Sequence, residues 1–325
     1  MKPIPLIGPA DFPAALDRCR RTGPPHYFAM YSSVAGGIVT DPALMLVPAD
    51  DHMVHRGDGI FETLKCIGSA LYNLEAHLTR LRLSAGRIRL PVPWSSADLA
   101  DLAVQTVHAG GRPEALVRIL VSRGPGGFGI SPAECPEPAL YIVAYAYPGS
   151  FMALHPGGAR AIRSSIVPRT PPFSHLKSVN YLPNVLMKME ALDARVDFTL
   201  SFDEKDHLAE GATENAGLVT RGRRLQVPRP ERILPGTTAH RVLELARPLI
   251  AGGLLSAVEE TDIPYAAARE AAEMLIFGTT PDVTSVVEFD GRPVGDGKPG
   301  PVGRALAARL AEDILHNAAL RTPVF

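Results

Sequence analysis

The chain of 325 residues has few cysteines, no long apolar run and a formal net charge of only −1. Cys19, Cys66 and Cys135 are scattered, odd in number and without CxxC spacing, which excludes a disulfide framework and indicates reduced thiols. No stretch reaches the roughly 18 apolar residues of a membrane span. Prolines and Asp11 interrupt the N-terminal segment before a signal-peptide core could form. These three observations lead us to expect a cytoplasmic protein. Because the net charge gives no attraction to nucleic acid or anionic membranes, we expect its partner to be a small molecule.

The length predicts two domains. Residues 148–158 mix proline, glycine and serine with little periodicity, which is typical of a linker. We therefore expect a small N-terminal α/β domain over residues 1–147 and a larger C-terminal α/β domain over residues 159–325. Strands and helices alternate without the regular rhythm of a doubly wound sheet, so the expected class is mixed α/β, or α+β.

Apolar periodicity and capping residues locate most of the expected elements. Asn73 is expected to cap one amphipathic helix, and Ser95 or Ser96 to cap another that has Asp98 in its first turn. Short apolar and β-branched runs bounded by turn residues indicate strands. We expect strands at 27–33, 44–47, 60–66, 70–72, 115–122, 139–147, 159–167, 197–202, 216–219 and 273–279, and helices at 74–86, 97–108, 181–194, 238–246 and 302–316.

Several sequence blocks occur in a fixed order along the chain. They are HRGDGIFETLK (55–65), LEAHLTRLRLSA (74–85), HLKSVNYLPNVL (175–186), LAEGATENAGLV (208–219), ILPGTTAHRVLELA (233–246) and EMLIFGTTPDVTSVVE (273–288). From about Tyr27 to Gly300, the chain resembles the class IV aminotransferases, which are fold-type IV pyridoxal phosphate enzymes. MYSS, GGIVTDP, DDHMVHRGDG, KSVNYLPNVL and SRGPGGFGISP are most similar to plant-type D-amino acid transaminases. The resemblance implies a two-domain fold, pyridoxal 5′-phosphate as cofactor and a homodimer with its active site near the subunit boundary.

The same resemblance assigns the chemistry at the cofactor ring. A lysine that forms an imine must lose its proton readily, which a partly desolvated site encourages. Lys177, in KSVNYL, is implied to be the catalytic Schiff-base lysine, and Tyr181 is expected near the phenolic oxygen of the cofactor. The ring nitrogen needs a carboxylate partner. Glu210, in the EGxxxN block, is implied to supply it, with Glu214 as a possible neighbour.

The cofactor phosphate requires backbone amides and a cation. Gly236, Thr237 and Thr238 stand at the start of an apolar helical pattern, where free amides and the helix dipole favour an anion. Thr279 ends a strand and offers a further donor. Arg80, in HxxRL, matches the phosphate-binding arginine of the family, and its planar donors suit a phosphate.

The substrate carboxylate requires another cation. The resemblance implies Arg123, in VSRG, for this role, whereas Arg118 lies five residues earlier and is expected on the opposite face of the strand. Phe61 stands where the better-known D-amino acid transaminases have a substrate-binding tyrosine, and no histidine closely follows Arg123. The run RGPGGFG lacks the GK[ST] of a phosphate-binding P-loop. The histidines show no metal-ligand spacing, so no metal site is expected.

Four functions remain open on this sequence. The first is a transaminase that moves an amino group between an amino acid, expected to be the D enantiomer, and a 2-oxo acid. Aminodeoxychorismate lyase would use the same lysine and cofactor but eliminate pyruvate. A branched-chain L-amino acid transaminase would differ in stereochemistry. A non-catalytic cofactor carrier would bind the cofactor without any half-reaction.

Overall fold

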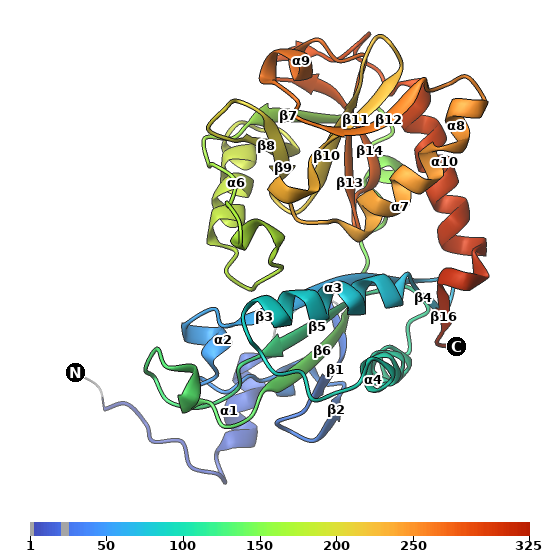
Figure 1. Cartoon of the computed structure of the whole chain (residues 1–325). Helices are drawn as coiled ribbons and strands as arrows, with labels where there is room; N and C mark the ends of the chain where they lie inside the picture. The colour runs from blue at the N-terminus through green and yellow to red at the C-terminus, as the bar shows by residue number, and fades with distance from the viewer. Residues whose placement is uncertain (1–2, 21–25) are drawn as a thin grey trace. The chain divides into compact units, whose positions relative to one another are not determined.

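The computed structural model describes residues 3–20 and 26–325 (Figure 1), except for the side chain of Cys19. Two compact units divide the chain. Unit 1 comprises residues 1–71, 90–147 and 322–325, and unit 2 comprises residues 72–89 and 148–321. The helix expected at 74–86 therefore groups with unit 2, although the sequence assigned it to the N-terminal domain.

Unit 1 is built on a seven-stranded sheet with the order β16-β4-β3-β5-β6-β1-β2. Neighbours from β4 to β2 run antiparallel, and helix α4 (Ser96–Ala109) packs on β1, β5 and β6. The strands are β1 (Tyr27–Ser32), β2 (Gly37–Val39), β3 (Gly59–Ile67), β4 (Ala70–Tyr72), β5 (Ala115–Ser122), β6 (Ala139–Tyr145) and β16 (Arg321–Pro323). The short helices α1 (Phe12–Cys19) and α2 (His52–His55) also belong to this unit.

Unit 2 contains a nine-stranded sheet with the order β12-β11-β10-β13-β14-β7-β8-β9, and β15 pairs with β14. Because β9 also pairs with β10, six strands form a closed ring of pairings. The strands are β7 (Ala159–Arg163), β8 (Phe198–Phe202), β9 (Leu208–Gly211), β10 (Asn215–Val219), β11 (Arg224–Pro228), β12 (Ala257–Thr261), β13 (Glu273–Gly278), β14 (Asp282–Phe289) and β15 (Arg292–Pro293).

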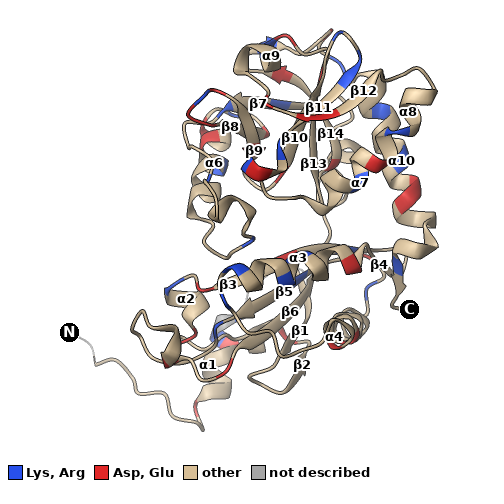
Figure 2. Ribbon diagram, in the orientation of Figure 1, with Lys and Arg blue, Asp and Glu red and all other residues tan. Residues whose placement is uncertain are grey.

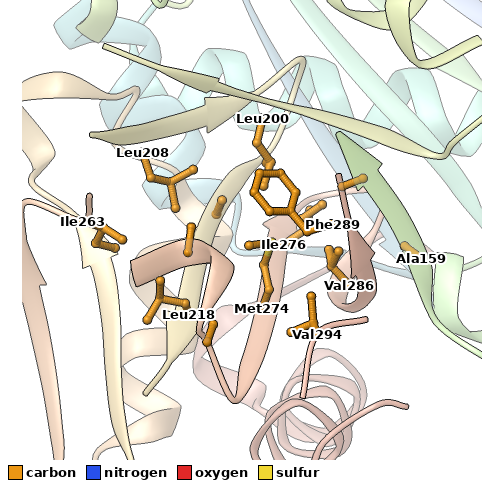
Figure 3. Packing of buried hydrophobic residues seen from close by; sticks show 14 of the residues in the cluster. Ala159, Leu200, Leu208, Leu218, Ile263, Met274, Ile276, Val286, Phe289 and Val294 are labelled. Carbon is orange, nitrogen blue, oxygen red and sulfur yellow. The ribbon is translucent and has the colours of Figure 1, made fainter. Parts of the chain in front are cut away.

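An apolar cluster packs strands of unit 2 together (Figure 3). Leu200, Met274, Ile276 and Phe289 are at most 1% exposed and come from three different strands. Closing the strands on each other removes these side chains from water, which is the main favourable contribution to folding. The ring of strands is therefore a packed core, and a ligand site must lie where strands end.

Unit 2 also contains seven of the helices. They are α3 (Leu74–Arg87), α5 (Phe151–Leu154), α6 (Leu182–Asp193), α7 (Thr237–Ala246), α8 (Pro248–Ala251), α9 (Tyr265–Arg269) and α10 (Pro301–His316). Of these, α5, α6, α7 and α10 pack on its strands. The start of α10 is fixed by Glu273, whose carboxylate accepts hydrogen bonds from the backbone N–H groups of Val302 (2.9 Å) and Gly303 (2.7 Å). Within residues 3–20 and 26–325, no helix combines the length and apolar composition that crossing a bilayer requires.

The structure confirms most expected elements to within a few residues. Ser95 caps α4 in a reciprocal capping box with Asp98, as the sequence indicates. Asn73 precedes α3, but its φ of 56° makes it a left-handed turn residue without a side-chain cap bond. The mixed α/β class is also found, with short additional helices that the sequence did not indicate.

Two strand predictions are wrong in whole or in part. Residues 44–47 form no strand, because Asp41 caps a 3₁₀ turn over Pro42–Leu44. The strand expected at 159–167 ends at Arg163. Beyond it, Ser164 and Ser165 donate hydrogen bonds to Glu190 of α6 instead of continuing the ladder.

Candidate active site

Lys177 lies in unit 2, in the segment between the 3₁₀ turn Phe173–His175 and α6. The residue is 8% exposed, and its Nζ lies 3.4 Å from the hydroxyl of Tyr181, the N-cap of α6. Its backbone N–H donates to the hydroxyl of the buried Ser84 on α3 (3.4 Å). The amine is therefore kept largely from bulk water beside a phenol, an arrangement suited to attack on a carbonyl carbon.

Glu210 lies at the end of β9, opposite Asn215 of β10. Its carboxylate accepts a hydrogen bond from the backbone N–H of Leu234 (3.0 Å). Desolvation raises the pKa of Glu210, and the Leu234 N–H together with the charges of Arg169 and Lys177 opposes this shift. A desolvated carboxylate of this kind gains most from a cationic partner.

The turn that precedes α7 is fixed on both sides. While Glu210 binds the N–H of Leu234, the side-chain amide of Asn215 donates to the carbonyl of Leu234 (2.9 Å). Gly236 follows, and a Cβ added there would lie 1.8 Å from Oδ1 of Asn215. Only glycine fits at this point, and the start of α7 is thereby held against the ends of β9 and β10.

The N-terminus of α7 meets one face of α3. Gly236 is the N-cap of α7 and provides no side-chain cap bond, so the first-turn amides are left for another acceptor. Arg80 is 7% exposed and donates to the carbonyl of Pro235 (3.0 Å). Oγ1 of Thr237 lies 3.2 Å from Nε2 of the buried His77. Helix amides, a helix dipole and a guanidinium together make a binding site for a phosphate.

The two remaining threonines are close to this turn. Thr238 is the second residue of α7 and is partly buried. Thr279 directly follows β13, whose Phe277 pairs with Asn215. Both hydroxyls therefore belong to the same end of the sheet as Gly236 and Glu210.

The donor set fits pyridoxal 5′-phosphate. That molecule presents an aldehyde, a basic ring nitrogen and a phosphate, which call for an amine, a carboxylate and an anion site. Lys177, Glu210 and the Arg80–α7 corner supply these three groups, and all of them belong to unit 2. The Glu210 carboxyl, which desolvation raises in pKa despite the Leu234 N–H bond, is the clearest sign that a cationic ring nitrogen belongs beside it.

The expected substrate residues belong to unit 1. Arg123 directly follows β5 and forms a bidentate ion pair with Asp58, in which both N–O distances are 3.0 Å. Phe61 of β3 is 7% exposed, and the guanidinium of the exposed Arg118 lies 5.2 Å from its ring centroid. Asp58 thus fixes the direction of Arg123, while Arg118 covers an aromatic ring.

The run RGPGGFG is folded around Glu134. The carboxylate of Glu134 accepts a hydrogen bond from the N–H of Gly129 (2.9 Å). A Cβ at Gly127 or Gly129 would lie 1.9 Å from this carboxylate. Arg56 donates to the carbonyl of Gly129 (2.9 Å) from the other side. The glycines therefore allow close packing on an acidic side chain. A carboxylate at this position would repel a phosphate, so the run is not a phosphate-binding loop.

Four residues near the cofactor groups were not assigned a role from the sequence. His77 and Ser84 share a face of α3 with Arg80, and helical spacing could have found them. Asn215 closes the EGxxxN block. The guanidinium of Arg169 lies 5.8 Å from the ring of Tyr181, and its Nη1 donates to the carbonyl of Leu176 (3.3 Å). No sequence pattern indicated Arg169. In the part of the chain that the structure describes, no group of three or more His, Cys, Asp or Glu side chains could hold a metal ion.

The sequence is similar to known aminotransferases along most of its length. Residues 59–289 match the sequence pattern described as amino-transferase class IV. The chloroplastic D-amino-acid transaminase of Arabidopsis thaliana is 39% identical over 313 residues, which cover 96% of this chain and 82% of the relative. A putative branched-chain-amino-acid aminotransferase of Methanocaldococcus jannaschii is 29% identical over 268 residues, or 81% of this chain and 89% of the relative.

A solved structure is similar as well. The T.th. branched-chain amino acid aminotransferase, complexed with N-(5′-phosphopyridoxyl)-L-glutamate, superposes with a TM-score of 0.83 at 25% identity. The superposition covers 93% of this chain and all of that one. With the geometry of unit 2, these similarities lead to one conclusion: the chain is a transferase that belongs to the class IV aminotransferase family.

Proposed function

We propose that this aminotransferase uses pyridoxal 5′-phosphate to transfer an amino group between a D-amino acid and a 2-oxo acid. The observation that carries the proposal is the meeting of an amine, a desolvated carboxyl and a helix N-terminus with an arginine in unit 2. When bound, the cofactor supplies a conjugated ring that accepts the electron pair left at the substrate α-carbon.

Lys177 performs the proton transfers. Its Nζ would move a proton between the substrate α-carbon and C4′ of the cofactor. Tyr181, 3.4 Å from this nitrogen, orients the amine. Ser84 fixes the backbone of Lys177 (3.4 Å), so the amine works from a constrained position.

Glu210 holds a proton on the ring nitrogen. Its carboxyl is desolvated, and a charged hydrogen bond formed there is stronger than it would be in water. Arg80, Gly236, Thr237, Thr238 and Thr279 bind the phosphate and set the plane of the ring. Because the Leu234 turn is bound by both Glu210 and Asn215, the ring-nitrogen site and the phosphate site keep a fixed separation.

Arg123 binds the substrate carboxylate, and Phe61 bounds the space for the substrate. The ion pair with Asp58 presents the guanidinium of Arg123 in one orientation. The D enantiomer is supported by the similarity to the Arabidopsis thaliana D-amino-acid transaminase. The similarity to branched-chain aminotransferases supports the L enantiomer as the second candidate.

An absorbance titration of the cofactor-loaded protein with separate D- and L-amino acids tests this function. We expect the band of the bound cofactor to decrease with D-alanine or D-glutamate, and to return when a 2-oxo acid is added. A response to L-leucine alone would assign the branched-chain reaction instead. Pyruvate released from aminodeoxychorismate without an oxo acid would identify a lyase, and no response to any of these compounds would leave only a cofactor carrier.

A further inference from the structure

The segment that leads from β7 to α6 contains two positive charges and no negative one. Between residues 164 and 181 the cations are Arg169 and Lys177, and no Asp or Glu occurs in this stretch (Figure 2). Arg169 is half-buried, and in the part of the chain that the structure describes it forms no ion pair. Elsewhere in unit 2, the partly buried Arg232 and Arg241 each pair with an aspartate. The charge of Arg169 is therefore left without a direct acidic partner.

The contacts of Arg169 lead to the amine of the candidate site. Its Nη1 donates to the carbonyl of Leu176 (3.3 Å), the residue before Lys177. Its guanidinium carbon lies 5.8 Å from the ring centroid of Tyr181, and Nζ of Lys177 lies 5.9 Å from the same centroid. The hydroxyl of that ring lies 3.4 Å from the lysine nitrogen. Arg169 thus contacts both neighbours of the amine, which are the backbone before it and the phenol beside it.

Two cations share one aromatic ring here, and only one of them can lose its charge. A guanidinium stays protonated in proteins, whereas a lysine amine loses its proton more readily when another positive charge is close. The repulsion between the two groups therefore favours the neutral form of Lys177. The neutral amine is also the form that attacks a carbonyl carbon.

We propose that Arg169 is a positioning residue for Lys177, whose fixed charge keeps the amine neutral and whose contacts keep it in place. The proposal rests on the proposed function, in which this amine reacts with the cofactor aldehyde. Arg169 touches neither of the reacting atoms and acts through Leu176 and Tyr181. An arginine suits this task better than a lysine, because its charge does not depend on pH and its plane can lie on an aromatic ring.

Glu210 of β9 is the acid that opposes this effect. Desolvation raises the pKa of Glu210, and the Leu234 N–H and the charges of Arg169 and Lys177 oppose that shift, so both cations act on this carboxyl. A charged Glu210 stabilises the charged amine, but this attraction weakens once Glu210 pairs with a cationic ring nitrogen. Arg169 then acts on Lys177 with less opposition. The other titratable or charged groups around the amine are Tyr181 of α6, His77, Arg80 and Arg87 of α3, His175 of the 3₁₀ turn, and Glu214 between β9 and β10.

Labelling of the cofactor-free protein with a trace of acetic anhydride tests the proposal, because only a neutral amine is acetylated. Peptide mass spectrometry gives the rate at Lys177, and the exposed Lys188 and Lys205 are internal references. Arg169→Gln keeps a donor for the Leu176 carbonyl but removes the charge. We expect it to lower the Lys177 rate at pH 7 roughly three- to tenfold. Arg169→Lys restores the charge and should recover most of the rate.

Arg221→Gln is the matched control, because Arg221 is exposed in the turn between β10 and β11 of the same unit, and its Lys177 rate should equal that of the wild type. If circular dichroism shows that Arg169→Gln is misfolded, Arg169→Met replaces it, since its aliphatic chain can still cover the Tyr181 ring. An unchanged Lys177 rate in a folded variant without the charge would overturn the proposal. So would a loss in Arg169→Lys as large as that in the neutral variant.

The spectrum of the cofactor-loaded protein separates this proposal from the proposed function. The pH at which the bound cofactor changes its absorbance band should be higher in Arg169→Gln than in the wild type, because a protonated nitrogen is no longer repelled there. If borohydride does not fix the cofactor to Lys177 in the wild type, the proposed function is contradicted, whereas the labelling result stands. Fixation at Lys177 with the same titration in both proteins would overturn the role of Arg169 alone.

Discussion

The two units differ in how their candidate functional residues are held. In unit 2, Lys177, Glu210 and Gly236 are positioned by bonds from several elements, including α3, β10 and the turn before α7. In unit 1, Arg123 follows the end of one strand and forms a bidentate ion pair with Asp58. The difference teaches that the proposed cofactor groups are held by contacts among several elements of unit 2, whereas the ion pair of the proposed substrate group joins the segments on either side of β3 and β5 in unit 1.

The largest effect is expected at the amine. Lys177→Ala should lower turnover by roughly 10⁴-fold or more, because it removes the amine proposed to transfer the substrate α-proton. The phosphate corner stays intact in this variant, so cofactor should still bind, which equilibrium dialysis can measure. Lys205→Ala, in an exposed turn of the same unit, is the control and should keep full activity. Turnover by the Lys177 variant would defeat the proposed function.

The next largest effect is expected at the carboxyl. Glu210→Gln keeps an acceptor for the Leu234 N–H but removes the negative charge, so kcat at saturating cofactor should fall roughly 10²- to 10³-fold. Glu214→Gln removes a neighbouring charge that hydrogen-bonds to Thr213, and it should lower kcat much less. Equal losses in the two variants would mean that Glu210 has no special contact with the ring.

A smaller effect is expected at the glycine of the α7 turn. Gly236→Ala forces the new methyl group against Asn215, and overpacking of this kind should weaken cofactor binding roughly 10- to 100-fold. A spectroscopic titration of apoenzyme with cofactor gives the dissociation constant. At Gly252 the nearest heavy atom to an added Cβ is 3.8 Å away, so Gly252→Ala should bind cofactor normally. An unchanged dissociation constant for the Gly236 variant would show that the start of α7 does not bind the cofactor phosphate.

The smallest effect is expected in unit 1. Arg123→Gln should raise KM for every amino donor roughly tenfold, the value of one charged hydrogen bond, because the α-carboxylate is common to all of them. The value of kcat at saturation should change little. Arg118→Gln is the comparison, since Arg118 is exposed on β5, the strand that Arg123 follows, and covers Phe61. A larger rise in KM for the Arg118 variant would show that Arg118, and not Arg123, contacts the substrate carboxylate.

Local signals in the sequence predicted many elements of the fold. Ser95 with Asp98 predicted the start of α4, and the apolar run 115–122 predicted β5. The sequence did not indicate β9 or β12, because the first has four residues and the second reads AVEET. The pairing of β9 with β10 that closes the strand ring is a tertiary contact without any local signature.

In the candidate site, too, residues in local sequence patterns could be predicted, whereas the contacts between distant segments could not. Lys177 and Glu210 stand in recognisable sequence blocks, whereas the bond from the Leu234 N–H to Glu210 involves a backbone group that no residue type reveals. Likewise, the ion pair of Arg123 joins residues 65 positions apart. Contacts of this kind depend on how the strands pair, so the sequence alone could not give them.

Helix α3 belongs to unit 2 although it precedes much of unit 1 in the chain. During synthesis, Arg80 therefore emerges well before the segments that carry Lys177, Glu210 and Gly236. Unit 1 in turn receives its edge strand β16 from the last residues of the chain. A nascent chain cannot assemble the complete phosphate corner early. A single cut near residue 148 would separate α3 from the rest of unit 2 and β16 from the rest of unit 1.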